Sequence, residues 1–192
     1  VRSRRQRQMC IRDRISSDKG LCGAFNSQVF KAVNKLIANK YQSQHANGNV
    51  TLLTLGTKGR DFFKKRQHNL NTEFVDVFKK LSFDYVKEAA EFAMNGFVDG
   101  KFDKVEIVYN EFKNVALQIV NVEQFLPIVE EVKENKEENS TAGDYIFEPS
   151  KEYIAKELIP KSLKIQFYKA VLDSNASEMG ARMTAMDKAT DN

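Results

Sequence analysis

The chain has 192 residues, 42% of them hydrophobic and 29% charged, and this length suits one domain or one domain with an appendage. It contains no run of eighteen apolar residues, so the sequence predicts no membrane-spanning helix. Its two cysteines, Cys10 and Cys22, come after no recognisable secretory signal, which argues against a disulfide framework and for a reducing compartment.

The net charge of +4 comes from one short segment. Residues 1–14 contain six arginines and one aspartate, whereas the remaining chain carries 24 basic and 25 acidic residues. A nucleic-acid-binding arm or a transit peptide is one interpretation of such a segment. Because its composition differs sharply from that of residues 15–192, we instead expect residues 1–14 to be a non-native or artefactual segment. Basic residues elsewhere lack interleaved aromatic residues, so we expect no nucleic-acid partner.

The segment 15–149 alternates helix-like and strand-like patterns, as an α/β domain does. A helix is predicted over 20–40, where apolar residues recur every three or four positions, and a polar loop over 42–49. Residues 50–56, VTLLTLG, are apolar on both faces, which is typical of a buried parallel strand. A short helix should open at Thr57.

The second half of this segment continues the alternation. An amphipathic helix is predicted over 82–100, with Ser82 or Asp84 as its cap. Strands are predicted to begin or run within 70–78, 102–112 and 115–127. This order predicts a Rossmann-like doubly wound α/β domain with right-handed crossovers.

Two stretches depart from the pattern. A phosphate-binding type of turn should follow an apolar strand, but CIRDRI at 10–15 is a poor strand, so we expect the strand before Ser16 to be missing. Residues 129–144 are highly charged with little apolar content, and we expect a solvated surface loop there.

Residues 150–192 are predicted to form a separate helical segment. From Pro160, a favourable first helical residue, a helix reaching Asn192 would be about 50 Å long. A compact chain of this length has a radius of gyration of only about 16 Å, so the helix must project or lie across a partner. Its apolar seam advances by alternating steps of three and four residues, the pattern of a coiled coil. The seam comprises Leu172, Ala176, Met179, Met183, Met186 and Thr190, and we expect its partner helix to lie outside this chain.

The turn SSDKGLCGAFN raises the question of a phosphate site. A P-loop requires Lys and Ser or Thr directly after its second glycine, but here Lys19 precedes Gly20, and Gly23 is followed by Ala24. The dinucleotide fingerprint requires three glycines, and only two occur. A weak anion site at the following helix stays open, but a tight structural turn is the favoured interpretation.

No catalytic or metal-binding constellation stands out. Cys22 as a nucleophile would need a neighbouring base, and the two histidines, His45 and His68, both lie in polar contexts. Two histidines and two scattered cysteines match no metal-site spacing, so we expect no metal and no cofactor. The residues alone thus favour a mechanical or assembly role over catalysis.

Two stretches resemble the gamma subunit of the F-type rotary ATP synthase. ISSDKGLCGAFN at 15–26 resembles the loop after that subunit's first strand, and ASEMGARMTAMDKATDN at 176–192 resembles the signature of its last helix. DYIFEPS at 144–150 and IPKSLKIQFYKAVLDS at 159–174 lie between them in the expected order. The resemblance covers about residues 15–192.

The resemblance implies a rotor shaft. In that family the N- and C-terminal helices form an antiparallel coiled coil inside a ring of alternating alpha and beta subunits, and the α/β domain lies near the epsilon subunit and the c-ring. Proton flow turns the c-ring, and the asymmetric shaft biases the catalytic sites on beta, so the chain itself would be non-catalytic. It would be peripheral to a bacterial inner (plasma) membrane through the complex, on the cytoplasmic side.

The resemblance also assigns residue roles. Tyr145 and Glu148 would rest on the polar loops of the c-ring, and Glu178 and Arg182 would face the alpha–beta ring. Asp187 stands where a basic residue or histidine is expected, which leaves its contact open. Coiled-coil packing is implied for Leu172, Ala176, Met179, Met183 and Met186, and a structural turn for Gly20 and Gly23.

The match implies a fragment that lacks the N-terminal helix, the first strand and the end of the C-terminal helix. Two alternatives remain. One is a small-molecule or nucleotide-binding α/β domain, motivated by the glycine turn, and the other is a nucleic-acid-binding protein, motivated by the arginines of residues 1–14.

Overall fold

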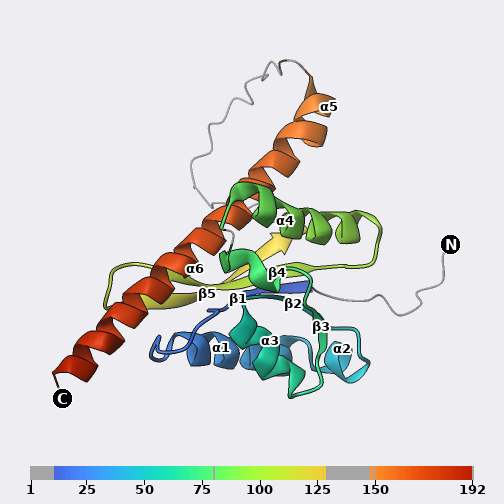
Figure 1. The fold of residues 1–192 in the computed structure, drawn as a ribbon. Helices are drawn as coiled ribbons and strands as arrows, with labels where there is room; N and C mark the ends of the chain where they lie inside the picture. The colour runs from blue at the N-terminus through green and yellow to red at the C-terminus, as the bar shows by residue number, and fades with distance from the viewer. Residues whose placement is uncertain (1–10, 80, 129–147, 149, 192) are drawn as a thin grey trace, which may run out of the picture.

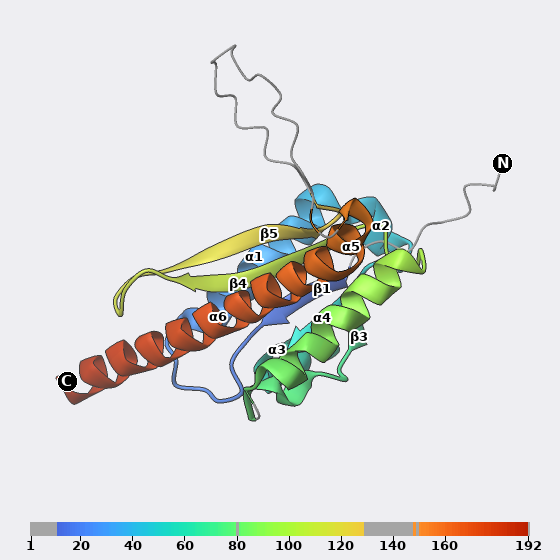
Figure 2. The same ribbon diagram turned by 90° about the horizontal axis from the view of Figure 1, so that it is seen from above.

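The computed structural model describes residues 11–79, 81–128, 148 and 150–191 as three layers, with a central sheet between two layers of helices. Helices α1 and α3 cover one face of the sheet, and α4 and the long α6 cover the other (Figures 1 and 2). The strands are β1 (Ile11–Ile15), β2 (Thr51–Leu55), β3 (Asn69–Asn71), β4 (Val105–Phe112) and β5 (Gln118–Leu126). The helices are α1 (Phe25–Lys40), α2 (Gln42–Ala46), α3 (Thr57–Lys64), η1 (Val75–Lys79), α4 (Phe83–Val98), α5 (Lys151–Tyr153), η2 (Ile154–Leu158) and α6 (Ile159–Thr190).

The sheet has the order β3-β2-β1-β4-β5. β1 pairs in parallel with β2 and with β4, β2 pairs in parallel with β3, and β5 joins β4 as an antiparallel hairpin. This is a doubly wound sheet with an antiparallel edge strand, and the prediction of the fold class is confirmed. The chain leaves β1 toward β2 on one side and later reaches β4 on the other, so the topological switch point lies between β1 and β4.

The expectation that no strand precedes Ser16 is wrong. Residues 11–15 form β1, the central strand, whose five residues pair with Thr51–Leu55 and whose first four pair with Val105–Val108. The charged sequence IRDRI has low intrinsic strand preference, but a central position supplies backbone partners on both sides. Pairing with distant segments thus overrides the local pattern.

Three other expectations need correction. The predicted loop over 42–49 contains the one-turn helix α2, and the predicted strand at 70–78 divides into the short β3 and the 3₁₀ helix η1. The first predicted helix begins at Phe25 rather than residue 20, because positive φ angles at Leu21 (64°) and Gly23 (54°) keep the preceding chain in a turn.

Two predictions about local sequence are confirmed. The helix predicted over 82–100 is α4, and the Ser82 hydroxyl accepts a hydrogen bond from the N–H of Tyr85 at 3.4 Å, as a capping serine does. The predicted buried strand is β2, in which Leu52, Leu53 and Leu55 are fully buried.

Two apolar cores hold the layers together. On the α4 and α6 face, the sheet packs against one cluster in which Phe167 and Val171 of α6 are fully buried. On the α1 and α3 face, Val29, Val33 and Phe63 form the other cluster.

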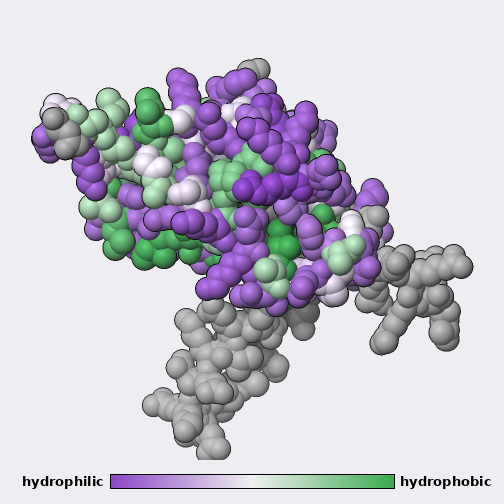
Figure 3. Space-filling view, turned by 90° about the horizontal axis from the view of Figure 1, so that it is seen from below, coloured by the Kyte–Doolittle hydropathy of each residue, from purple (hydrophilic) through white to green (hydrophobic). Residues whose placement is uncertain are grey.

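Figure 3 shows that hydrophilic residues cover most of the α1 and α3 face, while hydrophobic residues gather at the end formed by the β4–β5 hairpin. Among the described residues, no helix is both long and apolar enough to cross a bilayer.

The C-terminal helix begins upstream of its predicted start. Pro160 is the second residue of α6, and helical turns continue back through the π-helical η2 to α5 at Lys151. Proline lacks an N–H and clashes with the carbonyl four residues earlier in an α-helix, and a wider turn before Pro160 accommodates both effects. The predicted surface loop at 129–144 lies outside the described residues.

A buried carboxylate lies between α1 and the sheet. Glu106 of β4 is 2% exposed, and its Oε1 accepts hydrogen bonds from Lys40 Nζ at 2.6 Å and from the Tyr41 hydroxyl at 2.7 Å. Lys104 Nζ lies 3.3 Å away. The hydrogen bond to Glu106 raises the pKa of Lys40, whereas loss of hydration and the neighbouring Lys40 charge lower the pKa of Lys104. Lys40 is therefore the main partner of Glu106.

We expect Glu106→Gln to destabilise the chain by about 2 kcal/mol, because it removes the charge that strengthens both hydrogen bonds. Lys40→Met should cost less than about 1 kcal/mol, because that lysine is half exposed and Glu106 keeps both the Tyr41 hydrogen bond and the ammonium of Lys104 at 3.3 Å. Urea denaturation of both variants tests the order. A larger loss in the lysine variant would contradict it.

Candidate functional site

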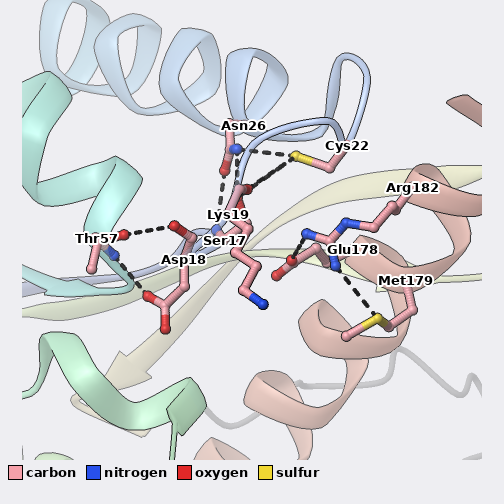
Figure 4. Close-up of polar contacts among 9 residues, drawn as sticks. All are labelled: Ser17, Asp18, Lys19, Cys22, Asn26, Thr57, Glu178, Met179 and Arg182. Atoms are coloured by element: carbon pink, nitrogen blue, oxygen red, sulfur yellow. Dashed lines mark hydrogen bonds and ion pairs between the residues drawn. The ribbon is translucent and has the colours of Figure 1, made fainter. Parts of the chain in front are cut away.

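The loop after β1 satisfies the N-terminus of α3. Ser16, Ser17 and Asp18 accept hydrogen bonds from the first three N–H groups of α3. Asp18 Oδ1 accepts from Thr57 at 2.9 Å (Figure 4). The Ser17 carbonyl accepts from Lys58 at 3.2 Å, and the Ser16 hydroxyl accepts from Gly59 at 2.9 Å. A helix N-terminus attracts anions through these unsatisfied groups. In α3 a carboxylate of the same chain already occupies that position.

The glycine turn continues from this loop into α1. Asn26 of α1 accepts from the Ser17 N–H at 3.1 Å through Oδ1 and donates through Nδ2 to the Ser17 hydroxyl at 2.6 Å and to Cys22 Sγ at 3.2 Å (Figure 4). Gly23 adopts φ of 54°, the left-handed region that favours glycine, whereas Gly20 has open space around it. The buried thiol of Cys22 thus lies within a hydrogen-bonded turn.

Helix α6 crosses the switch point, where doubly wound proteins usually bind ligands. Its Ser174 hydroxyl donates to the carbonyl of Ile15 at 3.3 Å, at the carboxyl end of β1, and its Ser177 hydroxyl donates to the carbonyl of Asn110 in β4 at 3.0 Å. A groove of about 180 Å³ remains between the turn, the hairpin and α6. Typical ligand pockets are about 300–1,000 Å³, so this groove is small for a nucleotide.

An ion pair on α6 lies over the loop that follows β1 (Figure 4). Glu178 is 5% exposed, and its Oε1 accepts a hydrogen bond from Nη2 of Arg182 at 2.5 Å, one helical turn away (Figure 4). Burial raises the pKa of the Glu178 carboxyl, although the guanidinium of Arg182 acts in the opposite direction. The pair is therefore more than a solvated surface contact, and Arg182 is its outward member, with 22% of its side chain exposed against 7% for Glu178.

We expect Arg182→Met to destabilise the chain by about 3 kcal/mol at neutral pH, because it leaves a buried carboxylate without its cation. The loss should disappear below about pH 4, where glutamate is protonated in the unfolded chain as well, and should grow as pH rises through the raised folded pKa of Glu178. Denaturant midpoints across this pH range measure the effect. In a Glu178→Gln background the same change should cost little at any pH, and a pH-independent cost would contradict the argument.

The outer face of α6 carries the predicted seam. Leu172, Met179, Met183 and Met186 are 39%, 52%, 57% and 60% exposed, and Ala176 is exposed with them. The opposite face packs on the β4–β5 hairpin at Gly180, where a Cβ would meet the Phe112 ring at 3.2 Å and the Val115 backbone at 3.4 Å. The seam is therefore a continuous apolar stripe that the described part of the chain leaves in solvent.

Comparison with known proteins decides the family. The chain is 53% identical over 178 residues to the ATP synthase gamma chain of Cytophaga hutchinsonii and 46% identical over 178 residues to that of Chlorobaculum parvum. A family model described as ATP synthase matches residues 5–192, starting inside the segment that we expected to be non-native. The chain belongs to the ATP synthase gamma family.

Solved structures agree on the fold of this gamma-family chain. It superposes with a TM-score of 0.67 and 24% identity on a chain of the Tetrahymena thermophila mitochondrial ATP synthase central stalk and c-ring structure, covering 95% of this chain and 77% of that one. A chain of the Euglena gracilis mitochondrial ATP synthase rotor gives a TM-score of 0.63 at 19% identity, covering 95% and 67%. The chain spans about 60% of the length of its curated relatives and 93% of its own length aligns with them.

The other site residues suggested by the resemblance fall in different places. Tyr145 lies outside the described residues, and Glu148 is exposed in a bend before α5. Sequence reasoning missed the capping of α3 by Asp18, whose only local signal is a carboxylate beside two serines. It also missed a contact between His45 and His68, which lie 23 positions apart and bring their ring nitrogens within 3.0 Å.

Proposed function

We propose that this chain is the α/β domain and part of the shaft of a central rotor subunit in a proton-translocating ATP synthase. In this role it couples rotation of the c-ring to conformational change at the catalytic sites of the beta subunits, and it is itself non-catalytic. The exposed seam of α6 carries the proposal, since an apolar stripe with alternating three- and four-residue steps requires a partner helix. Membership of the gamma family supports it.

The proposed partners are the alpha and beta subunits, the epsilon subunit and the c-ring, which would hold the chain peripherally on the cytoplasmic side of a bacterial inner membrane. Leu172, Ala176, Met179, Met183 and Met186 would pack on an N-terminal helix of the whole protein. Glu178 and Arg182 would face the alpha–beta ring, with Arg182 the more exposed of the two, and Tyr145 and Glu148 would meet the c-ring.

The alternative of a nucleotide-binding domain has less support. Helix α6 covers the switch point, and the groove beside the glycine turn is only about 180 Å³. Gly20 and Gly23 are thus better explained as parts of a structural turn.

Co-purification tests the proposed role. The intact gene product, tagged and co-expressed with the alpha, beta and epsilon subunits of the same genome, should recover all three. Met179→Lys combined with Met183→Lys should abolish recovery of alpha and beta. The matched control, Val98→Lys on α4, places the same charge at an 82% exposed apolar residue away from the seam and should leave recovery intact.

Recovery of none of the three subunits would count against the rotor role. Saturable nucleotide binding in calorimetry, lost on substitution of Gly20 or Gly23, would support the alternative.

A further inference from the structure

Helices α1 and α3, which cover one face of the sheet, carry an excess of positive charge. Residues 19–72, which include both helices, contain nine basic residues and one acidic residue, Asp61. Residues 73–192 contain 15 basic and 23 acidic residues, so the chain that follows has the opposite balance. Figure 3 shows hydrophilic residues over most of the α1 and α3 face. The contacts proposed for the rotor role use none of its charges.

Five lysines on this face lack a carboxylate partner. Eight other lysines lie within 3.5 Å of an Asp or Glu oxygen, among them Lys79 beside Asp76 and Lys101 beside Asp99. Within the described part of the chain the five lysines form no ion pair, and the one carboxylate near them in sequence, Asp61, is paired with Arg60 at 2.9 Å. We call these five exposed residues the basic face: Lys31, Lys35, Lys58, Lys64 and Lys65.

The unpaired ammonium groups repel one another. Lys31 and Lys35 lie one turn apart on α1, and Lys64 and Lys65 are consecutive at the end of α3. Like charges four positions apart on a helix destabilise it, and an anion that lies across them removes the repulsion. The folded chain is thus less stable at this face than it would be with a negatively charged partner bound there.

Aromatic contacts join the two helices and argue against two kinds of anionic partner. The rings of Phe30 in α1 and Phe62 in α3 stack with centroids 4.3 Å apart, and the Arg66 guanidinium lies 3.6 Å from the centroid of the Phe62 ring. A nucleic-acid base would have to displace these contacts in order to stack on either ring. Neither helix exposes a large hydrophobic side chain that could insert into a bilayer. The basic face therefore fits the carboxylates of a protein better than a nucleic acid or a membrane.

We propose that the basic face docks an acidic segment of a partner protein, whose Asp and Glu side chains pair with its five lysines. The same pairing of ammonium with carboxylate already occupies eight lysines elsewhere on the chain. A lysine ammonium is a point charge without the fixed fork of arginine, so the face selects density of negative charge rather than one exact geometry. The attraction is long-ranged and weakens with salt. This inference does not depend on the proposed rotor role.

Fluorescence anisotropy of a short labelled poly-L-glutamate peptide, titrated with the full chain, tests the docking surface. Binding should be saturable at about 50 mM salt and should weaken about tenfold or more at about 300 mM salt. Lys35→Glu combined with Lys64→Glu should weaken binding about tenfold or more, because each change replaces an attraction by a repulsion. The matched control, Lys79→Glu combined with Lys101→Glu, changes the net charge equally at lysines that are 64% and 66% exposed. It should alter binding by less than about twofold.

Carbodiimide cross-linking of the peptide carboxylates to lysine amines, mapped by mass spectrometry, provides a second readout. Cross-links should concentrate on the basic face. The arginines of residues 1–14 are present in both double variants, so any binding that they contribute is common to both. Circular dichroism establishes that the variants are folded. Absence of saturable binding, equal losses in the two folded variants, or tighter binding of phosphatidylserine vesicles or duplex DNA than of the peptide would overturn the proposal.

Discussion

Replacing Gly56 by alanine should destabilise the chain by about 4 kcal/mol or more, or prevent folding. Gly56 lies between β2 and α3 with φ of 103°, a conformation that residues with a side chain rarely adopt. Its Cβ would also lie 2.1 Å from the carbonyl oxygen of Ser16, which is backbone and cannot turn aside. The substitution therefore separates β2 from the loop that caps α3, and chemical denaturation measures the cost.

Gly48→Ala is the matched control. Gly48 also has positive φ, 70°, but nothing lies within 4 Å of the position its Cβ would take. The Gly48→Ala variant should lose about 1 kcal/mol of stability, which is the cost of a left-handed backbone conformation alone. Equal losses of stability in the Gly56 and Gly48 variants would contradict the argument that the contact with Ser16 destabilises the Gly56 variant.

Phe167→Ala should cost about 3–5 kcal/mol, the range for truncating a large, fully buried aromatic side chain. Phe167 is 0% exposed and packs against Phe125 of β5 with ring centroids 5.8 Å apart, so it anchors α6 to the sheet. The variant should also show faster amide hydrogen exchange along α6, because the helix loses its main attachment.

Ile165→Ala, two residues earlier on the same helix, gives the comparison. Ile165 is 60% exposed, so its truncation should change stability by less than about 0.5 kcal/mol. Similar losses of stability in the two variants would contradict the argument that the buried side chain of Phe167 anchors α6 to the sheet.

Helices and strands whose own residues determine their structure could be predicted from the sequence. β2 is apolar on both faces and α4 has a capping serine before its apolar stripe, so each could be assigned from its own residues. The apolar stripe of α6 could be assigned in the same way, while its packing on a partner helix stays a prediction. Its three- and four-residue spacing is a local property, and the exposure of Met179 and Met183 agrees with it.

Elements that depend on distant partners were not predictable. β1 is charged and was expected to be missing, but β2 and β4 supply its hydrogen bonds from 40 or more positions away. The capping of α3 by Asp18 spans 39 positions, and the contact of His45 with His68 joins segments that no spacing rule connects. In each case a pairing in three dimensions, rather than a residue pattern, determines the outcome.

Because α6 is both a core element and a projecting arm, a load at its tip acts directly on the sheet. Past Thr184, whose hydroxyl donates to the Val115 carbonyl at 3.2 Å, the helix continues for about 9 Å to Thr190 without a proline or glycine at which it could bend. A sideways displacement there becomes a torque about the segment anchored by Phe167 and Val171. The arm therefore behaves as a stiff lever whose fulcrum is the interior of the domain.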